Sequence, residues 1–411
     1  MRSGVSPAGV KYAVRRSGRS VAYCALSVGC GTVQEAGFPS GTAHFVEHTL
    51  FRGTRLKKAS VINSYLDRLG GELNAYTTKE EIVLHATVLK EDIWKAARLL
   101  FELSTEPTFP DDEIETERGV VLDEIISYKD NPAEDVYDKF EGLLFQGHPL
   151  EQPILGTTAS VKKITPEQLR RFVATFFTPE RMAFTLVADA EEEALEKKVL
   201  RLLESIFPAP ETRLPSTRKN PAPMPATPPF RKVVDKRNHE VNAVIGCQGP
   251  SLYQMPDRMT TAMLVNILGG PASNSLLNNE LREKRGWVYG IECTYTQYAD
   301  TGIVAISFGC DRPNLEKCRK AIGQILARLC EKPLSETRLR SYRKQLLGQL
   351  AIASEAGEAQ CLSMGKSLLA WGQIMSPEET KARLEAITPE DIRQMAARLF
   401  SPENLSSLIY L

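Results

Sequence analysis

Residues 165–188 of the chain read TPEQLRRFVATFFTPERMAFTLVA, and residues 388–411 read TPEDIRQMAARLFSPENLSSLIYL. The two stretches align at a constant offset of 223 residues, and eight of their 24 positions are identical. In each copy a Thr-Pro pair typical of a helix start precedes an amphipathic pattern, a turn with a proline and an apolar strand pattern. Because each copy ends one half of the chain, the repeat predicts two homologous domains.

A proline-rich stretch separates these halves. Eight prolines fall between Pro208 and Pro229. Proline fixes φ and has no backbone N–H, so such a segment forms an extended, semi-rigid connector. The predicted division is therefore a first domain at 1–207, a linker at 208–229 and a second domain at 230–411.

The apolar patterns of both halves indicate a mixed fold. Short apolar or alternating runs predict strands at 20–31, 80–89, 239–249 and 301–310. Helical spacing predicts helices at 91–103, 110–130, 256–270 and 315–332. Strands occur in groups with helices between them, which predicts the α+β class.

Composition limits the class of protein. The 411 residues carry 51 basic and 51 acidic side chains, a net charge of zero, without the basic excess of nucleic-acid-binding proteins. No run of 18 apolar residues suggests a membrane span, and the first residues lack the apolar core of a signal peptide. Eight scattered cysteines without a C-x-x-C pair predict free thiols in a reducing compartment. We expect a cytoplasmic protein without nucleic-acid or membrane partners.

The stretch SGTAHFVEHTLF at residues 40–51 carries two of the five histidines. In a helix beginning near Thr42, His44 and His48 are four positions apart and share one face, where both can bind one zinc ion. Glu47 lies on nearly the same face and can reach water at the metal without being a ligand. The residue order H-x-x-E-H is the inverse of the common zinc-peptidase motif H-E-x-x-H and favours a metal site over a polar helix face.

A catalytic zinc ion usually has three protein ligands, so a third is expected elsewhere. Glu117 and Glu124 are seven residues apart on a predicted helix, hence on one face, and Asp123 is adjacent. His85 in a predicted strand and His148 in a loop are further candidates, although structural roles suit them better. Side-chain chemistry alone leaves the choice among these carboxylates open.

Several stretches resemble the inverzincin peptidases typified by pitrilysin, insulysin and the mitochondrial processing peptidase, above all the short two-domain bacterial and processing-peptidase-like members. The resemblance covers nearly the whole chain, through GTAHFVEHTLFRGT (41–54), GGELNAYTTKEEIVLHATVL (70–89), ETERGVVLDEI (115–125), GHPLEQPILGT (147–157) and LREKRGWVYGI (281–291). The family's fold implies two homologous domains, each a mainly antiparallel sheet with flanking helices, that form half of a clamshell.

The resemblance also implies roles for individual residues. His44, His48 and Glu124 would bind one zinc ion per chain, Glu47 would be the general base that deprotonates the zinc-bound water, and Glu117 would orient a ligand histidine. The edge strand that holds Leu73, Asn74, Ala75 and Tyr76 would bind peptide substrate as an added β-strand. Arg282 and Tyr289 would contact substrate near the cleaved bond.

The implied function is that of a zinc endopeptidase that hydrolyses short or unfolded peptides in a closed chamber. Because two domains make half of a clamshell, the resemblance implies a homodimer in which Arg282 and Tyr289 act on the partner's zinc site. A heterodimer with a homologous chain is the alternative assembly. The competing function is a noncatalytic peptide-binding or scaffold subunit, although such relatives usually have an eroded zinc motif.

Overall fold

The computed structural model describes residues 1–209 and 221–411, and the chain divides into two compact units. The first unit consists of residues 1–126, the described part of 152–217, and 351–375. The second consists of residues 127–151, the described part of 218–350, and 376–411. Two segments, 127–151 and 351–375, therefore cross the predicted domain boundaries, and each belongs to the unit formed mainly by the other half of the chain.

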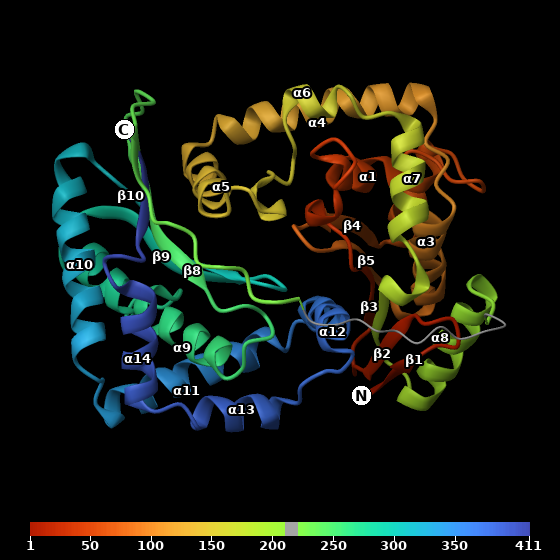
Figure 1. Ribbon diagram of the computed structural model, residues 1–411. Coiled ribbons are helices and arrows are strands. Elements are labelled where there is room, and N and C mark those ends of the chain that lie inside the picture. The colour runs from red at the N-terminus through yellow and green to blue at the C-terminus, as the bar shows by residue number, and fades with distance from the viewer. Residues whose placement is uncertain (210–220) are drawn as a thin grey trace. The chain divides into compact units, whose positions relative to one another are not determined.

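The first unit contains a six-stranded sheet in the order β1-β2-β6-β3-β5-β4 (Figure 1). Its strands are β1 (Arg2–Val5), β2 (Lys11–Arg16), β3 (Val21–Val28), β4 (Glu72–Thr77), β5 (Ile82–Leu89) and β6 (Met182–Ala188). All neighbours run antiparallel except β2 and β6, which are parallel. β4 pairs only with β5, so it leaves one side of its backbone free of a neighbouring strand within the described chain.

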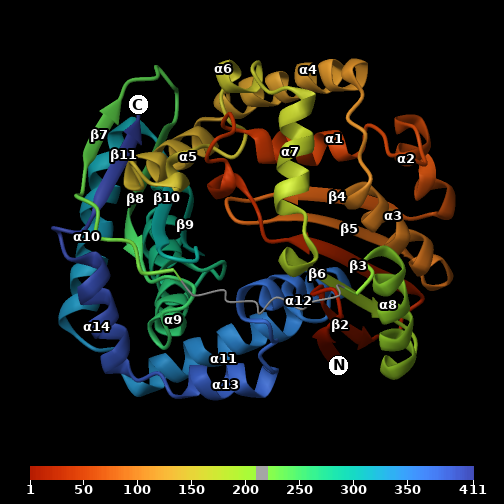
Figure 2. The same ribbon diagram turned by 45° about the vertical axis from the view of Figure 1, so that its right-hand side comes forward.

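Helices pack on both faces of this sheet. They are α1 (Thr42–Leu50), α2 (Ala59–Tyr65), α3 (Ile93–Thr105), α4 (Asp111–Lys129), α6 (Thr158–Val161), α7 (Pro166–Phe176), α8 (Glu192–Ile206) and α12 (Gly357–Trp371). Leu26, Leu84 and Phe184 point into the larger core, which α1, α3, α7 and α8 share. Their strand neighbours Ala25 and Val83 face α12 instead, as alternation along a strand requires. Figure 2 shows α7 beside α1 on the first of these faces.

Helix α12 approaches its sheet unusually closely because small residues line its inner face. Gly357, Cys361 and Gly365 follow one another at intervals of four residues. A Cβ on Gly365 would lie 2.6 Å from Oγ of Ser27. The Thr185 hydroxyl donates a hydrogen bond of 2.9 Å to the carbonyl oxygen of Cys361. These contacts attach a helix from the second half of the chain to the first sheet.

The second unit contains a five-stranded sheet in the order β7-β11-β8-β10-β9 (Figure 1). Its strands are β7 (Arg231–Val234), β8 (Val241–Gly249), β9 (Val288–Gln297), β10 (Gly302–Cys310) and β11 (Ser406–Tyr410). Its helices are α5 (Pro132–Leu144), α9 (Asp257–Gly269), the π-helix η6 (Asn278–Glu283), α10 (Leu315–Glu331), α11 (Glu336–Ala353), α13 (Pro377–Glu385) and α14 (Pro389–Phe400). α5 packs against β8 and β11, while α9, α10 and α14 supply the buried core.

The two sheets repeat one topology, which confirms the α+β class and the internal repeat. The order β2-β6-β3-β5-β4 corresponds to β7-β11-β8-β10-β9, and the parallel pair occupies the same place in both. Thr165 accepts a hydrogen bond from the backbone N–H of Gln168 at the start of α7, and Thr388 accepts one from Asp391 at the start of α14. In both copies proline is the first helical residue.

The remaining predictions concern the linker, the cysteines and membrane-spanning helices. Residues 208–209 and 221–229 of the predicted linker contain no helix or strand, and 210–220 lie outside the described residues. All eight cysteines are free. Within the described chain, no helix combines the length and apolar composition that a membrane crossing requires.

Candidate metal centre

Helix α1 is preceded by Gly41, a position where the backbone conformation favours glycine. Gly41 has a φ of 89°, in the left-handed region, and a Cβ there would lie 2.7 Å from the carbonyl oxygen of Leu155. Both conditions favour glycine. The buried carboxylate of Glu35 accepts hydrogen bonds from the backbone N–H groups of Gly41 and Ala43, at 3.0 and 2.8 Å. A side chain from outside the helix thus satisfies donors of its first turn.

Two histidines of α1 and one glutamate of α4 converge. His44 and His48 lie one turn apart, with ring centroids separated by 4.5 Å. Oε2 of Glu124 lies 3.6 Å from Nε2 of His44 and 3.3 Å from Nε2 of His48. Among the described residues these three form the one group of His, Cys, Asp or Glu side chains that could hold a metal ion, with donor atoms within 4.8 Å of one another.

The spacing of the three donor atoms fits a tetrahedral metal ion. Two atoms that each bind one tetrahedral zinc ion at about 2.0–2.1 Å lie about 3.4 Å apart. In addition, Oε2 of Glu124 is shielded from solvent and has no hydrogen-bond partner in the described chain. A buried carboxylate oxygen normally has a donor or a cation beside it, so the unpaired atom is consistent with a cation at this point.

Glu117 lies on the same face of α4 as Glu124 and orients the ring of His48. Its Oε1 atom lies 2.7 Å from Nδ1 of His48, and its other oxygen forms an ion pair with Arg52. Burial raises the pKa of Glu117, but the hydrogen bond to His48 and the guanidinium of Arg52 outweigh it and hold the pKa below its usual range. The ionised carboxylate accepts a hydrogen bond from the Nδ1–H group, and Nε2 of His48 faces Glu124.

The two imidazoles have opposite pKa shifts. Burial, and then the neighbouring His48, lower the pKa of His44 to about 4. Burial also lowers the pKa of His48, but Glu117 and Glu124 outweigh burial and raise it to about 9. The close contact with His48 lowers the pKa of Glu124. A positive charge is therefore favourable between these carboxylates.

Glu47 lies beside the three converging residues without joining them. Its Oε2 atom accepts a hydrogen bond of 2.6 Å from the hydroxyl of Thr77, the last residue of β4. Burial raises the pKa of Glu47 above its usual value, although this hydrogen bond lowers it. A half-buried carboxyl with a raised pKa next to a cluster of metal-ligand type is typical of a general base.

The predicted substrate strand is the free edge of the first sheet. Leu73, Asn74, Ala75 and Tyr76 all belong to β4, which pairs with β5 and packs against α1. Asn74 is exposed and the other three are half-buried. Through Thr77 this edge strand contacts Glu47, so the strand and the converging histidines form one continuous region of the first unit.

The other candidate ligands lie elsewhere. His85 pairs through Nδ1 with Glu358 of α12 at 3.0 Å, and His148 pairs through Nε2 with Asp300 at 3.0 Å. Both histidines connect elements within their own units. The side chain of Asp123 is exposed and forms no ion pair or hydrogen bond with the described part of the chain. Of the carboxylates left open by the sequence, Glu124 is therefore the one that faces both histidines.

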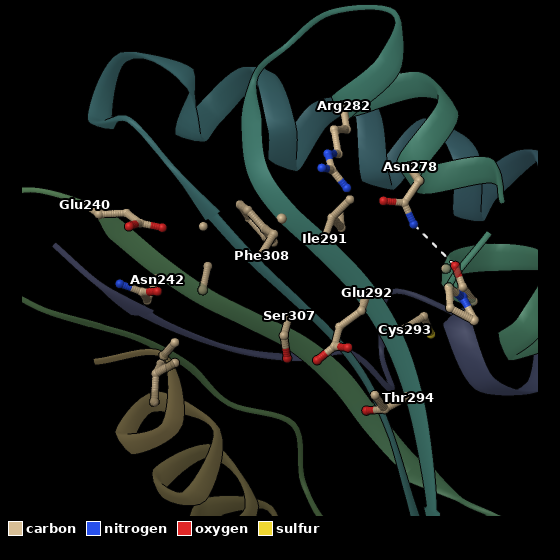
Figure 3. Close-up of a pocket in the computed structure, with 18 residues that line it drawn as sticks. Glu240, Asn242, Asn278, Arg282, Ile291, Glu292, Cys293, Thr294, Ser307 and Phe308 are labelled. Carbon is tan, nitrogen blue, oxygen red and sulfur yellow. Dashed lines mark hydrogen bonds between the residues drawn. The ribbon is translucent and has the colours of Figure 1, made fainter. Parts of the chain in front are cut away.

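Arg282 and Tyr289 belong to the second unit. Arg282 lines a pocket of about 590 Å³ between η6, the sheet and the start of α5 (Figure 3). Tyr289 is 58% exposed and donates a hydrogen bond of 2.7 Å to Asp311. Their contact with substrate stays a prediction.

Sequence reasoning missed three residues that support the site. Glu35 satisfies the start of α1, Thr77 binds Glu47, and Arg52 pairs with Glu117. Arg52 carries a local signal, because it follows His48 by four positions, the spacing at which side chains of a helical turn can meet. Glu35 and Thr77 come from other elements, and no spacing along the chain points to them.

Two protein-family models match the chain. "Insulinase (Peptidase family M16)" matches residues 11–158, and "Peptidase M16 inactive domain" matches residues 163–346. Both models describe domains of one family, and together they extend over most of the chain. The chain belongs to peptidase family M16.

Individual proteins agree with this assignment. An uncharacterized zinc protease of Streptomyces coelicolor is 28% identical over 376 residues, which cover 89% of this chain and 80% of the relative. A protease from Helicobacter pylori has a crystal structure that matches with a TM-score of 0.89 at 19% identity, covering 100% of this chain and 98% of the other. The peptidase M16 inactive domain from Pseudomonas fluorescens matches with a TM-score of 0.87 at 18% identity, covering 100% and 97%. At these identities the two structures show a shared fold.

Proposed function

We propose that the chain is a zinc-dependent endopeptidase that hydrolyses short or unfolded peptides. One observation carries the proposal: the Nε2 atoms of His44 and His48 converge on Oε2 of Glu124, with Glu47 beside them. Relatives named zinc proteases support the same reading. The region described as an inactive domain, residues 163–346, contains none of these four residues.

His44, His48 and Glu124 would hold the zinc ion. A zinc ion with three protein ligands and an open fourth position supplies a Lewis acid that polarises a carbonyl and acidifies water. Glu117 and Arg52 keep the ring of His48 oriented, because Glu117 binds Nδ1 and Arg52 in turn holds the carboxylate.

Glu47 would act as the general base. Its carboxylate takes the proton from the attacking water and returns it to the nitrogen of the leaving amine. Burial raises the pKa of Glu47, which makes its carboxylate a stronger base toward the water proton. The hydroxyl of Thr77 fixes one carboxylate oxygen, and the other would accept the proton of the reacting water.

Peptide would bind along β4 as an added strand. Backbone groups on the free edge of β4 can pair with an extended chain, whereas a folded protein offers no such strand. Because the pairing uses backbone atoms, many sequences fit, and the substrate class is short or unfolded polypeptide.

Metal removal tests the proposal. We expect the purified chain to cleave an unstructured peptide of about 20–30 residues, to lose that activity on dialysis against a chelator, and to regain it with one equivalent of zinc. Cleavage products are identified by mass spectrometry. Activity that persists in protein shown to be metal-free would contradict the proposal.

A noncatalytic peptide-binding subunit is the second candidate. It is favoured by the description of residues 163–346 as an inactive domain, which covers nearly half of the chain. In that case the chain would bind the peptide without cutting it, both as purified and after zinc is added.

A further inference from the structure

We propose that the pocket of the second unit binds a basic group of the peptide and that Glu292 is its main determinant. This inference rests on the proposed function, because it names a substrate feature for the same peptidase. The pocket has a volume of about 590 Å³, enough for a long side chain and adjoining backbone. Figure 3 shows the pocket between the sheet, η6 and the first turns of α5.

Gly290 leaves open space at the pocket. Gly269 and Gly270 at the end of α9, Gly290 on β9 and Gly309 on β10 all line it. A Cβ on Gly290 would meet no atom within 4 Å, so space remains next to this strand. A larger side chain at Gly290 would therefore enter the open space without a backbone clash.

The charged side chains of the pocket have no partners of their own. Glu240, Glu292 and Arg282 are the three charged lining residues, which gives a formal charge of −2 + 1 = −1. Within the described residues none of the three forms an ion pair or a side-chain hydrogen bond. Unpaired charges in a concave site are available to a ligand of opposite charge.

Two carboxylates and one guanidinium favour a peptide that presents a cation. Glu292 lies opposite Ser307 on the neighbouring strand, and Oγ of Ser307 is buried without a hydrogen-bond partner (Figure 3). An ammonium or guanidinium group placed here would contact the carboxylate of Glu292. Arg282, which enters from η6, would then face a peptide carbonyl rather than a second cation.

Apolar ligands fit the pocket less well. Ile291 and Phe308 line it, but they are only 6% and 4% exposed and belong to the buried core. The accessible lining also includes polar groups, among them the exposed side chain of Glu292. A basic side chain is therefore a better match than an aliphatic one.

The test measures peptide binding by the full chain with Glu47→Gln, which would retain peptide without cutting it. The probes are fluorescent, amidated and acetylated neutral peptides with a single lysine moved along the sequence, and matched peptides with norleucine instead. An additional peptide with a free amino terminus separates an α-ammonium group from a lysine side chain. Anisotropy gives the dissociation constants at low and high salt.

We expect one lysine position to bind roughly fivefold more tightly than norleucine, the effect of one partly exposed ion pair. Adding Glu292→Gln should remove this preference, and salt should weaken it. Glu292→Lys should prefer a peptide with glutamate at that position. Gly290→Val should reduce binding by filling the pocket. Glu283→Gln is the matched control, because Glu283 is exposed on η6 but does not line the pocket.

Equal binding of all lysine and norleucine peptides, or a lysine preference that survives Glu292→Gln, would overturn the inference. Cleavage by the wild type separates this failure from that of the proposed function. If the wild type cleaves lysine and norleucine peptides at equal rates, the peptidase proposal stands and the basic pocket is wrong. If it cleaves none while Glu292→Gln still abolishes a lysine preference, the pocket stands and the peptidase proposal is wrong.

Discussion

His48 lies between two carboxylates with different tasks. Glu124 faces Nε2 at 3.3 Å, while Glu117 binds Nδ1 at 2.7 Å and pairs with Arg52. Glu124 contacts the Nε2 side of the ring, where a metal would bind, and Glu117 holds the ring through Nδ1. The same face of α4 thus supplies both a candidate ligand and the residue that orients another ligand.

Substitution of Glu117 tests this division of roles. We expect Glu117→Gln to retain the fold but to weaken zinc affinity by about 10- to 100-fold, because the amide holds Nδ1 of His48 less firmly. Glu124→Gln should reduce zinc content further, since it removes a ligand. Asp123→Asn, an exposed neighbour on α4, should leave zinc binding unchanged. Competition with a chromophoric chelator measures all three, and equal affinities for the wild type and Glu117→Gln would contradict the assigned role.

The pattern at residues 44–48 predicted the histidine pair because both residues lie on one helix, where spacing determines direction. The third ligand could not be chosen in this way. Glu117, Asp123 and Glu124 have similar chemistry, and only the packing of α4 against α1 decides that Glu124 faces both rings. The family resemblance pointed to Glu124, which agrees with the geometry.

At the scale of elements, periodic apolar patterns and capping residues predicted the strands and helices well. β3, β5, β8 and β10 and the helices α3, α4, α9 and α10 all occur within the predicted ranges or close to them. Patterning did not reveal that α5 and α12 each pack in the unit formed mainly by the other half of the chain. An apolar helix face predicts burial but not which sheet buries it, because that choice depends on contacts far apart in sequence.

The close contact of α12 with its sheet makes glycine necessary at its inner face. Gly365→Val would place side-chain atoms against Ser27, and we expect a loss of about 1–3 kcal/mol in unfolding free energy. Gly348→Ala is the control, because Gly348 lies in α11 with no atom within 4 Å of a Cβ and should gain about 0.5–1 kcal/mol. Urea denaturation measures both changes. A neutral Gly365→Val would contradict the packing described for α12.

We expect the free energy of unfolding to depend on pH through Glu35, which binds the first turn of α1. Burial raises the pKa of Glu35 from 4.5 to about 8, although the N–H groups of Ala43 and Gly41 and the charge of Lys79 lower it. Since the folded state has the higher pKa, the contribution of Glu35 to stability is complete below about pH 4.5 and is lost as the pH rises through about 8.

Glu35→Gln tests this dependence, because glutamine does not titrate. We expect the difference in unfolding free energy between the wild type and the variant to be largest near about pH 5 and to shrink toward about pH 8. Urea titrations of metal-free protein at both pH values exclude a change in zinc affinity as the cause. A difference that stays constant with pH would contradict the raised pKa.

At the scale of the whole molecule, one topology has been used twice for different purposes. The helix that follows β3 carries His44 and His48, whereas α9, which follows β8, has no histidine. The second unit instead has a charged pocket beside the corresponding edge strand, β9. Duplication thus pairs a unit that carries the candidate metal centre with a unit that carries a charged pocket.

The predicted homodimer, in which Arg282 and Tyr289 act on the partner's zinc site, stays a prediction. The mass of the active protein in solution decides it. A monomeric mass together with full peptidase activity would contradict the dimer without affecting the metal centre.

Glu47 is the proposed base of a zinc peptidase, and its replacement by glutamine tests this role. Cleavage of an unstructured peptide of about 20–30 residues is compared for the wild type and Glu47→Gln at equal zinc content. We expect cleavage by the wild type and a loss of at least about 10²–10⁴-fold in the variant, the contribution typical of a general base. Equal cleavage by the two proteins, with zinc bound in both, would contradict it.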